Sequence, residues 1–347
     1  MLRNKGILLV SAAGVIFLVL ITSLAFLFSK DATYGHAPVD AAEALDHHEF
    51  EAQTTKLDEL LDENDPRASF DYLRATIKNN AAVARVCHPL LHHLGHAAYE
   101  KYKDFNTAVN YQDGLCNSGY THGVIEAHFM ASDDINVALQ TTCPSQDSKQ
   151  TFQQWQCNHG MGHGVMYYTG KDLAQSLSLC ETLSTTEASR SCINGAFMER
   201  FIIVSHSGMQ TTETSNISID LCGEQEEKYK SDCYTYAPTA YLERHTNDYT
   251  GAFKDCKNAG DTYISTCIYG VGGQAMKENV TRPDVAMDIC KNAPQKYVNS
   301  CISGAIAVLI NHHATTLPVQ PLCETTFSEY KDICKARIKT WNDSYAS

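Results

Sequence analysis

Residues 290–301 read CKNAPQKYVNSC, and the pattern C-x6-Y-x3-C within this stretch sets the organisation of the chain. The same pattern occurs four times, with first cysteines at Cys222, Cys256, Cys290 and Cys323, which are 34, 34 and 33 residues apart. A period near 34 residues is typical of repeats that each contain one helical hairpin. The spacing therefore predicts an all-α fold of stacked hairpins, a solenoid.

Apolar residues around the cysteine pairs recur at helical spacing. Residues 284–290 have the pattern of the end of one helix, and residues 297–310 have that of a second helix. Glycine inside a helix costs up to about 1 kcal/mol relative to alanine, so we expect a glycine there to let a neighbouring helix approach closely. Five glycines follow the second cysteine of a pair by three residues: Gly119, Gly160, Gly195, Gly270 and Gly304.

The 14 cysteines are an even number and include no C-x-x-C motif, which argues against zinc ribbons and thioredoxin-like redox pairs. Cysteines of one hairpin are close in sequence, so we expect each pair to form a disulfide that joins the two helices of its hairpin, which we call local closure. Each such bond closes a loop of about a dozen residues and contributes roughly 3 kcal/mol. The predicted pairs are Cys87–Cys116, Cys143–Cys157, Cys180–Cys192, Cys222–Cys233, Cys256–Cys267, Cys290–Cys301 and Cys323–Cys334.

This architecture resembles the Sel1-like, cysteine-rich helical-repeat proteins that some bacteria secrete, in which a disulfide joins the two helices of each hairpin. The resemblance covers about residues 130–345 and rests on the period and on the paired cysteines. It implies a fold of disulfide-stapled hairpins and implies no activity.

Residues 7–28 form a run of 22 residues without a charged side chain, long enough to cross a bilayer as a helix. Arg3 and Lys5 precede the run, so we expect the N-terminus in the cytoplasm and the bulk of the chain outside it. A cleaved signal peptide is the alternative, although its apolar core is usually shorter. In both cases residues 31–347 lie in an oxidising compartment, where disulfides persist.

The chain is therefore expected to be a single-pass protein of the cell membrane. The net charge of −13 and the lack of a basic run argue against nucleic acid as a partner. The C-terminal repeats carry cysteines without the histidines, which predicts a surface for a protein partner there. The predicted segments are a cytoplasmic tail (1–6), a transmembrane anchor (7–28), a tether (29–65), histidine-rich helical repeats (66–170) and cysteine-rich helical repeats (171–347).

Histidines recur at helical spacing in the first repeats. Residues 87–96 (CHPLLHHLGH) and residues 157–164 (CNHGMGHG) each contain two histidines four residues apart, on one helix face. Residues 116–123 (CNSGYTHG) contain one histidine. A shift of the first segment by three residues aligns the last histidines of all three, and stacked helices bring aligned positions together. The predicted ligands are His96, His122 and His163 at the centre, with His92 and His159 one turn earlier.

Convergent imidazoles from separate helices, with carboxylates nearby, suit a divalent transition metal such as zinc, copper or iron. Glu100 and Glu126 each follow an aligned histidine by four residues and are candidate general bases. A ligating Met198, at the aligned position of the fourth repeat, would favour copper. The alternative is a polar core in which the histidines cap helices and hydrogen-bond to one another.

The sequence thus predicts a membrane-anchored, extracytoplasmic metal-binding protein for metal handling or sensing. Two other classes stay open. One is a metal-dependent enzyme that uses the same cluster, with Glu126 or Glu100 as the base. The other is a pure protein-interaction scaffold, since solenoids present long concave surfaces. The zinc-protease motif H-E-x-x-H is absent, and whether the chain catalyses a reaction is left open by its sequence.

Overall fold

The structure, a computed structural model, describes residues 47–143, 150–202 and 217–345. All of these residues belong to one compact unit, which spans residues 38–347. Within the described ranges the chain forms helices and no strand, which confirms the predicted all-α fold. None of the described helices has the length and apolarity of a membrane span. The predicted anchor, residues 7–28, lies outside the described residues.

The helices divide into short and long ones. The α-helices are α2 (His47–Glu63), α3 (Pro66–Ile77), α4 (Ala81–Arg85), α5 (Cys87–Tyr102), α6 (Phe105–Val109), α7 (Leu115–Met130), α8 (Ile135–Thr142), α9 (Phe152–Tyr168), α10 (Leu173–Glu181), α11 (Thr186–Phe201), α12 (Asp220–Gly223), α13 (Glu227–Arg244), α14 (Tyr249–Asp255), α15 (Gly260–Glu278), α16 (Pro283–Lys291), α17 (Val298–His313) and α18 (Lys331–Ser344). The 3₁₀ helices are η1 (Cys256–Ala259), η2 (Gln295–Tyr297), η3 (Gln320–Glu324) and η4 (Ser328–Tyr330).

Short helices alternate with long ones from α6 onward. The short helices α6, α8, α10, α12, α14 and α16 have four to nine residues, and the long helices that follow them have 16 to 19. Four of the short helices begin after an aspartate whose side chain accepts a hydrogen bond from an N–H group of the first turn. These N-cap residues are Asp104, Asp134, Asp172 and Asp248. The unit is therefore a series of helical hairpins, as the sequence period predicts.

The seven disulfides are the seven pairs predicted from local closure. Six of them join the long helix of a hairpin to the short helical segment before it or to the residue that ends that segment, as Cys290–Cys301 joins α16 to α17. Cys87–Cys116 differs from the expectation, because it joins the starts of α5 and α7, two long helices that pack against each other. All 14 cysteines are paired.

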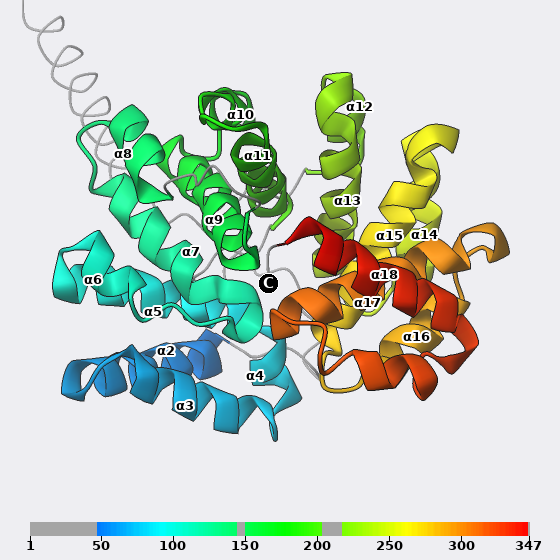
Figure 1. The fold of residues 1–347 in the computed structure, drawn as a ribbon, viewed down its shortest axis with the longest axis horizontal. Coiled ribbons are helices and arrows are strands. Elements are labelled where there is room, and N and C mark those ends of the chain that lie inside the picture. Colours follow the sequence, from blue (N-terminus) through cyan, green and yellow to red (C-terminus); the bar gives the residue numbers. More distant parts are fainter. Residues whose placement is uncertain (1–46, 144–149, 203–216, 346–347) are drawn as a thin grey trace, which may run out of the picture. The chain divides into compact units, whose positions relative to one another are not determined.

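The long helices pack side by side in chain order and close into a ring. Each of α7, α9, α11, α13 and α15 contacts the next long helix, and α17 also contacts α7. Figure 1 shows these helices around a common centre, toward which α18 runs. The aromatic ring of Phe152, at the start of α9, lies 5.5 Å from that of Trp341 and 5.1 Å from that of Tyr345. The repeats thus enclose a central space, where the predicted solenoid would present an open concave face.

Glycines set the spacing between the long helices. A Cβ atom built on Gly123 lies 2.1 Å from the backbone oxygen of His92, and one built on Gly195 lies 1.9 Å from that of His159. No side chain fits at these distances, so glycine is required where α5 meets α7 and where α9 meets α11. The close approach expected at Gly195 is confirmed, and both contacts place histidines against a neighbouring helix.

The first helices form an apolar core of their own. Residues 47–63, within the predicted tether, are the packed helix α2, whose Leu57 and Leu61 are buried against α3 and α5. Phe70 and Leu73 of α3 complete this core with residues of α5 and α7. Helices α5 and α7, which carry His88, His92 and His122, therefore have an apolar layer on one side.

Candidate metal centre

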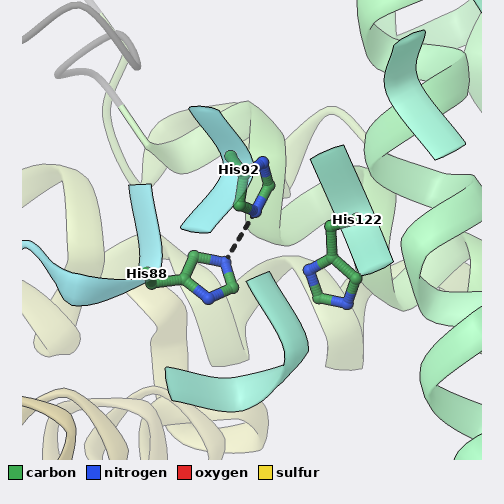
Figure 2. A group of neighbouring side chains, drawn as sticks. All are labelled: His88, His92 and His122. Atoms are coloured by element: carbon green, nitrogen blue, oxygen red, sulfur yellow. Dashed lines mark hydrogen bonds between the residues drawn. The ribbon is translucent and has the colours of Figure 1, made fainter. Parts of the chain in front are cut away.

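Five histidine side chains from three adjacent long helices form a cluster in the interior, termed the histidine cluster. Each is at most 4% exposed. Helix α5 contributes His88 and His92, α7 contributes His122, and α9 contributes His159 and His163. The ring centroids of His88 and His92 are 4.5 Å apart, and those of the stacked His122 and His163 are 4.7 Å apart. Figure 2 shows His88, His92 and His122 converging on one region.

A left-handed turn at the start of α7 orients one of these rings. Cys116, Asn117 and Ser118 have φ angles of 49°, 58° and 59°. Three consecutive non-glycine residues in this conformation cost roughly 1–2 kcal/mol each, and such strain is typical of functional sites. The turn brings the carbonyl oxygen of Cys116 to 2.7 Å from His88 Nδ1. Because a carbonyl oxygen only accepts hydrogen bonds, His88 Nδ1 is the donor.

A buried carboxylate fixes the next ring. Glu126 of α7 is 0% exposed, and its two oxygens lie 2.9 Å from His92 Nδ1 and 2.7 Å from His96 Nε2. The His96 side chain is 35% exposed, so Glu126 joins the interior of the cluster to its edge. His96 Nε2 hydrogen-bonds to Oε2 of Glu126, and Oε1 contacts His92 Nδ1, so the carboxylate is placed to orient both rings.

Glu199 of α11 plays the same part for His163. It is 1% exposed, and one of its oxygens lies 2.8 Å from His163 Nδ1. Lys171 forms an ion pair with the other oxygen. Burial raises the pKa of the Glu199 carboxyl, and Lys171 opposes that rise. Two of the five rings, His88 and His163, thus have Nδ1 held by a hydrogen bond to an oxygen, and Nδ1 of a third, His92, lies 2.9 Å from Glu126.

The remaining nitrogens of these rings face one another. His88 Nε2 lies 3.0 Å from His92 Nε2, and His159 Nε2 lies 3.3 Å from His163 Nε2. A neutral ring that donates through Nδ1 has a lone pair and no proton on Nε2. Burial holds the pKa of His88 and His163 well below the usual range, which favours the neutral form. Because His88 donates through Nδ1, its Nε2 atom has a lone pair and accepts a hydrogen bond from Nε2–H of His92.

His122 lies among these rings without a hydrogen bond of its own. Neither of its ring nitrogens has a hydrogen-bond partner among the described residues. An unsatisfied buried polar group costs about 1–3 kcal/mol. One nitrogen each of His88, His92 and His122 fit within 4.8 Å of one another, as do ligand atoms of His92, Glu126 and His163. The two groups share His92, so His92 is the centre of the cluster.

Acid is expected to destabilise the metal-free protein. Burial holds the pKa of His88, His122 and His163 well below 6.5 and lowers that of His159 to about 3. Below pH 6.5 the unfolded chain binds a proton at each of these histidines and the folded chain does not. The free energy of unfolding therefore falls with pH, by roughly 1 kcal/mol per pH unit for each histidine. Glu199 acts oppositely, because its pKa is raised.

Urea unfolding of chelator-treated protein between about pH 7.5 and 5.5 measures this loss. The four histidines lower the free energy of unfolding and Glu199 opposes them. The net decrease should be several kcal/mol over this range, on the order of 3 kcal/mol between pH 6.5 and 5.5. The variant His159→Gln serves as the control, because it removes one titrating group and should give a shallower slope. A free energy of unfolding that stays constant across the range contradicts a neutral cluster.

The structure brings together four of the five predicted ligands, namely His92, His122, His159 and His163. It places His96 at the edge, on the outer oxygen of Glu126. The close contact between Gly123 and His92 sets the register of α5 against α7, so His92 lies level with His122 and His96 lies beyond it.

The two candidate bases are also placed differently from each other. Glu126 is buried and contacts two histidines, with a hydrogen bond to His96, which suits an orienting role. Glu100 is 66% exposed and pairs with Lys103 at the surface, outside the cluster. Met198 lines a cavity beside His122 and is partly buried.

Sequence reasoning did not select His88 or Glu199. His88 precedes His92 by four residues, the same spacing as in His159 and His163, so this signal was present in residues 87–96. Glu199 directly follows the aligned position of the fourth repeat, but its role depends on the packing of α9 against α11.

Comparisons with protein-family models, with curated proteins and with solved structures found no match to this chain. The resemblance to Sel1-like repeat proteins therefore stays a prediction. The class of protein that the fold and site define is a disulfide-stapled helical-repeat protein with buried histidine and glutamate groups suited to a metal ion.

Proposed function

We propose that the protein binds a transition-metal ion in the histidine cluster, with His88, His92 and His122 as ligands. We further propose that it does so outside the cytoplasm, anchored by residues 7–28, in metal handling or sensing. One observation carries the proposal: ligand nitrogens of three buried histidines, His88, His92 and His122, lie within 4.8 Å of one another. Burial holds the pKa of His88 and His122 well below the usual range, so these rings are neutral, the form in which imidazole binds a metal ion.

The nitrogen positions suit a metal ion. Two nitrogens bound tetrahedrally to one zinc ion at about 2.0–2.1 Å lie roughly 3.3 Å apart. The Nε2 atoms of His88 and His92 are 3.0 Å apart, close to this separation. A metal bond also explains His122, whose ring nitrogens otherwise have no partner. Neutral imidazoles with carboxylates behind them suit zinc, copper or iron, and all cysteines are engaged in disulfides.

Elemental analysis of the full-length chain in detergent tests the proposal. After chelation, supply of zinc, copper(II) or iron(II) and removal of excess ion, we expect about one equivalent of one metal, bound more weakly as pH falls below about 6.5. Less than about a tenth of an equivalent of every metal, with the helical signal intact, contradicts it.

The predicted location has its own test. The seven disulfides suit an oxidising, extracytoplasmic compartment. A reporter that is active only in the cytoplasm, fused after Ser347, should therefore be silent in cells that make the full chain. The same fusion without residues 7–28 is the control and should be active. An active reporter on the full chain contradicts the proposed topology.

A second candidate function is that of a metal-dependent enzyme. It is favoured by a cavity that reaches His122 and His159, because an enzyme needs space for a substrate beside its metal. Glu126 is already engaged by His92 and His96, so a base for such a reaction is better sought among groups that line the cavity.

A further inference from the structure

The ring of long helices encloses a cavity of about 300 Å³. Helices α7, α9, α11, α13, α15 and α17 all contribute to its lining. Its volume is at the lower end of the roughly 300–1,000 Å³ of small-molecule sites. His122 and His159 form part of its wall, so the cavity adjoins the histidine cluster.

The charge of the lining is one-sided. Lys277 of α15 contributes an ammonium group, and the described lining contains no carboxylate. Within the described residues Lys277 Nζ has no hydrogen bond or salt bridge. Burial lowers the pKa of Lys277, while Glu243, Glu278 and Glu199 at longer range oppose that shift. A partly buried ammonium without a close partner is a site for an anion. Burial removes part of the hydration that stabilises the charge, and pairing with an anion replaces that stabilisation.

Polar amides and aromatic rings complete the lining. The Tyr236 hydroxyl donates to Asn194 Oδ1 over 2.7 Å, and Asn194 Nδ2 donates to Asp232 Oδ1 over 2.7 Å. This chain of hydrogen bonds fixes the side chain of Asn194 at the cavity wall. Trp155 stacks on His159 with ring centroids 4.9 Å apart, and it lines the cavity too. Such a wall suits a planar apolar body with a few polar groups.

We propose that this cavity binds a small organic carboxylate, with its carboxylate on Lys277 and its planar body beside Trp155. Its placement next to a metal ion rests on the proposed function, but recognition of its charge by Lys277 does not. A bound carboxylate would thus lie between the ammonium group and the His122 face of the histidine cluster. The protein would then handle an organic anion together with its metal.

Tryptophan fluorescence offers a direct measurement. The chain has two tryptophans, so the full-length variant Trp341→Phe leaves Trp155 as the single reporter. Benzoate is the probe, and benzamide is the matched neutral molecule. We expect saturable quenching by benzoate and much weaker binding of benzamide, in chelator-treated protein as well as in metal-loaded protein. Calorimetry on the unsubstituted chain repeats the measurement in case Trp341→Phe perturbs the fold.

A lysine variant locates the interaction. Lys277→Gln should weaken benzoate binding by roughly 10- to 100-fold, the loss expected for a hydrogen bond to a charged group, and leave benzamide binding unchanged. Lys254→Gln, on the exposed surface of α14, is the control and should bind benzoate normally. Equal affinity for benzoate and benzamide, equal loss in both variants, or no saturable binding by either method overturns the proposal. If benzoate binds but the protein takes up no metal, the result supports the cavity site and contradicts only the proposed metal centre.

Discussion

Reduction of the seven disulfides is expected to unfold the protein in buffer without denaturant. Six of them link cysteines 11–14 residues apart, and the seventh links cysteines 29 residues apart. Each closed loop of this size stabilises a fold by roughly 3 kcal/mol, so the seven together contribute on the order of 20 kcal/mol. A typical domain is stable by only about 5–15 kcal/mol. Loss of the helical circular dichroism signal after reduction and alkylation measures the effect.

Two double variants provide controls for this experiment. Alanine at Cys87 and Cys116 removes the link beside the left-handed turn, whose carbonyl accepts from His88 Nδ1. It should cost roughly 3 kcal/mol of stability and also lower metal affinity about 10- to 100-fold. Alanine at Cys323 and Cys334 removes only a staple of the last hairpin and should leave metal affinity unchanged. A fully reduced protein that keeps its helical signal contradicts the main expectation.

The hairpins and their disulfides could be predicted because both are local and periodic. The length of a hairpin repeat is visible in the sequence as a period, and a loop of about a dozen residues can close in few ways. The repeat from Cys290 to Cys301 therefore predicted both the end of α16 and the start of α17. Cys87–Cys116 departs from this local pattern, since its cysteines are 29 residues apart and join two neighbouring long helices.

The register of the histidines could not be predicted in the same way. Which side chains meet depends on how far one helix is displaced along the next. Here that displacement is set by backbone contacts such as Gly123 against His92. A shift of three residues, chosen to align His96 with His122, selected the wrong turn of α5. The structure places His92 in the cluster and His96 at its edge.

Closure of the ring is a property of the whole unit. Each hairpin rotates slightly relative to the previous one, and the sum of these rotations decides whether the last repeat meets the first. No single repeat encodes that sum. Its consequences are nonetheless visible in single contacts, such as Trp341 against Phe152, which join α18 to α9. The cavity that Lys277 lines is formed by six long helices and depends on this closure, so no sequence motif predicts it.

Replacement of His92 by alanine is expected to abolish stable metal binding. His92 belongs to both groups of potential ligands, and it lies between Glu126, at 2.9 Å from Nδ1, and His88, at 3.0 Å from Nε2. Structural zinc sites bind with roughly 10–16 kcal/mol shared among about four ligands, so one ligand is worth about 3 kcal/mol, more than a hundredfold in affinity. Competition with a chromophoric chelator measures the change.

His93→Ala is the matched control for this variant. His93 follows His92 on the same helix, but its side chain is 35% exposed and pairs with Asp58 at 2.9 Å, away from the cluster. Metal affinity should therefore be unchanged. His92→Ala also removes one of the two imidazoles on Glu126, which costs about 1–3 kcal/mol of stability, so affinity is measured well below the unfolding temperature. If His92→Ala retains full affinity while His93→Ala loses it, the cluster is a hydrogen-bonded core and the metal lies elsewhere.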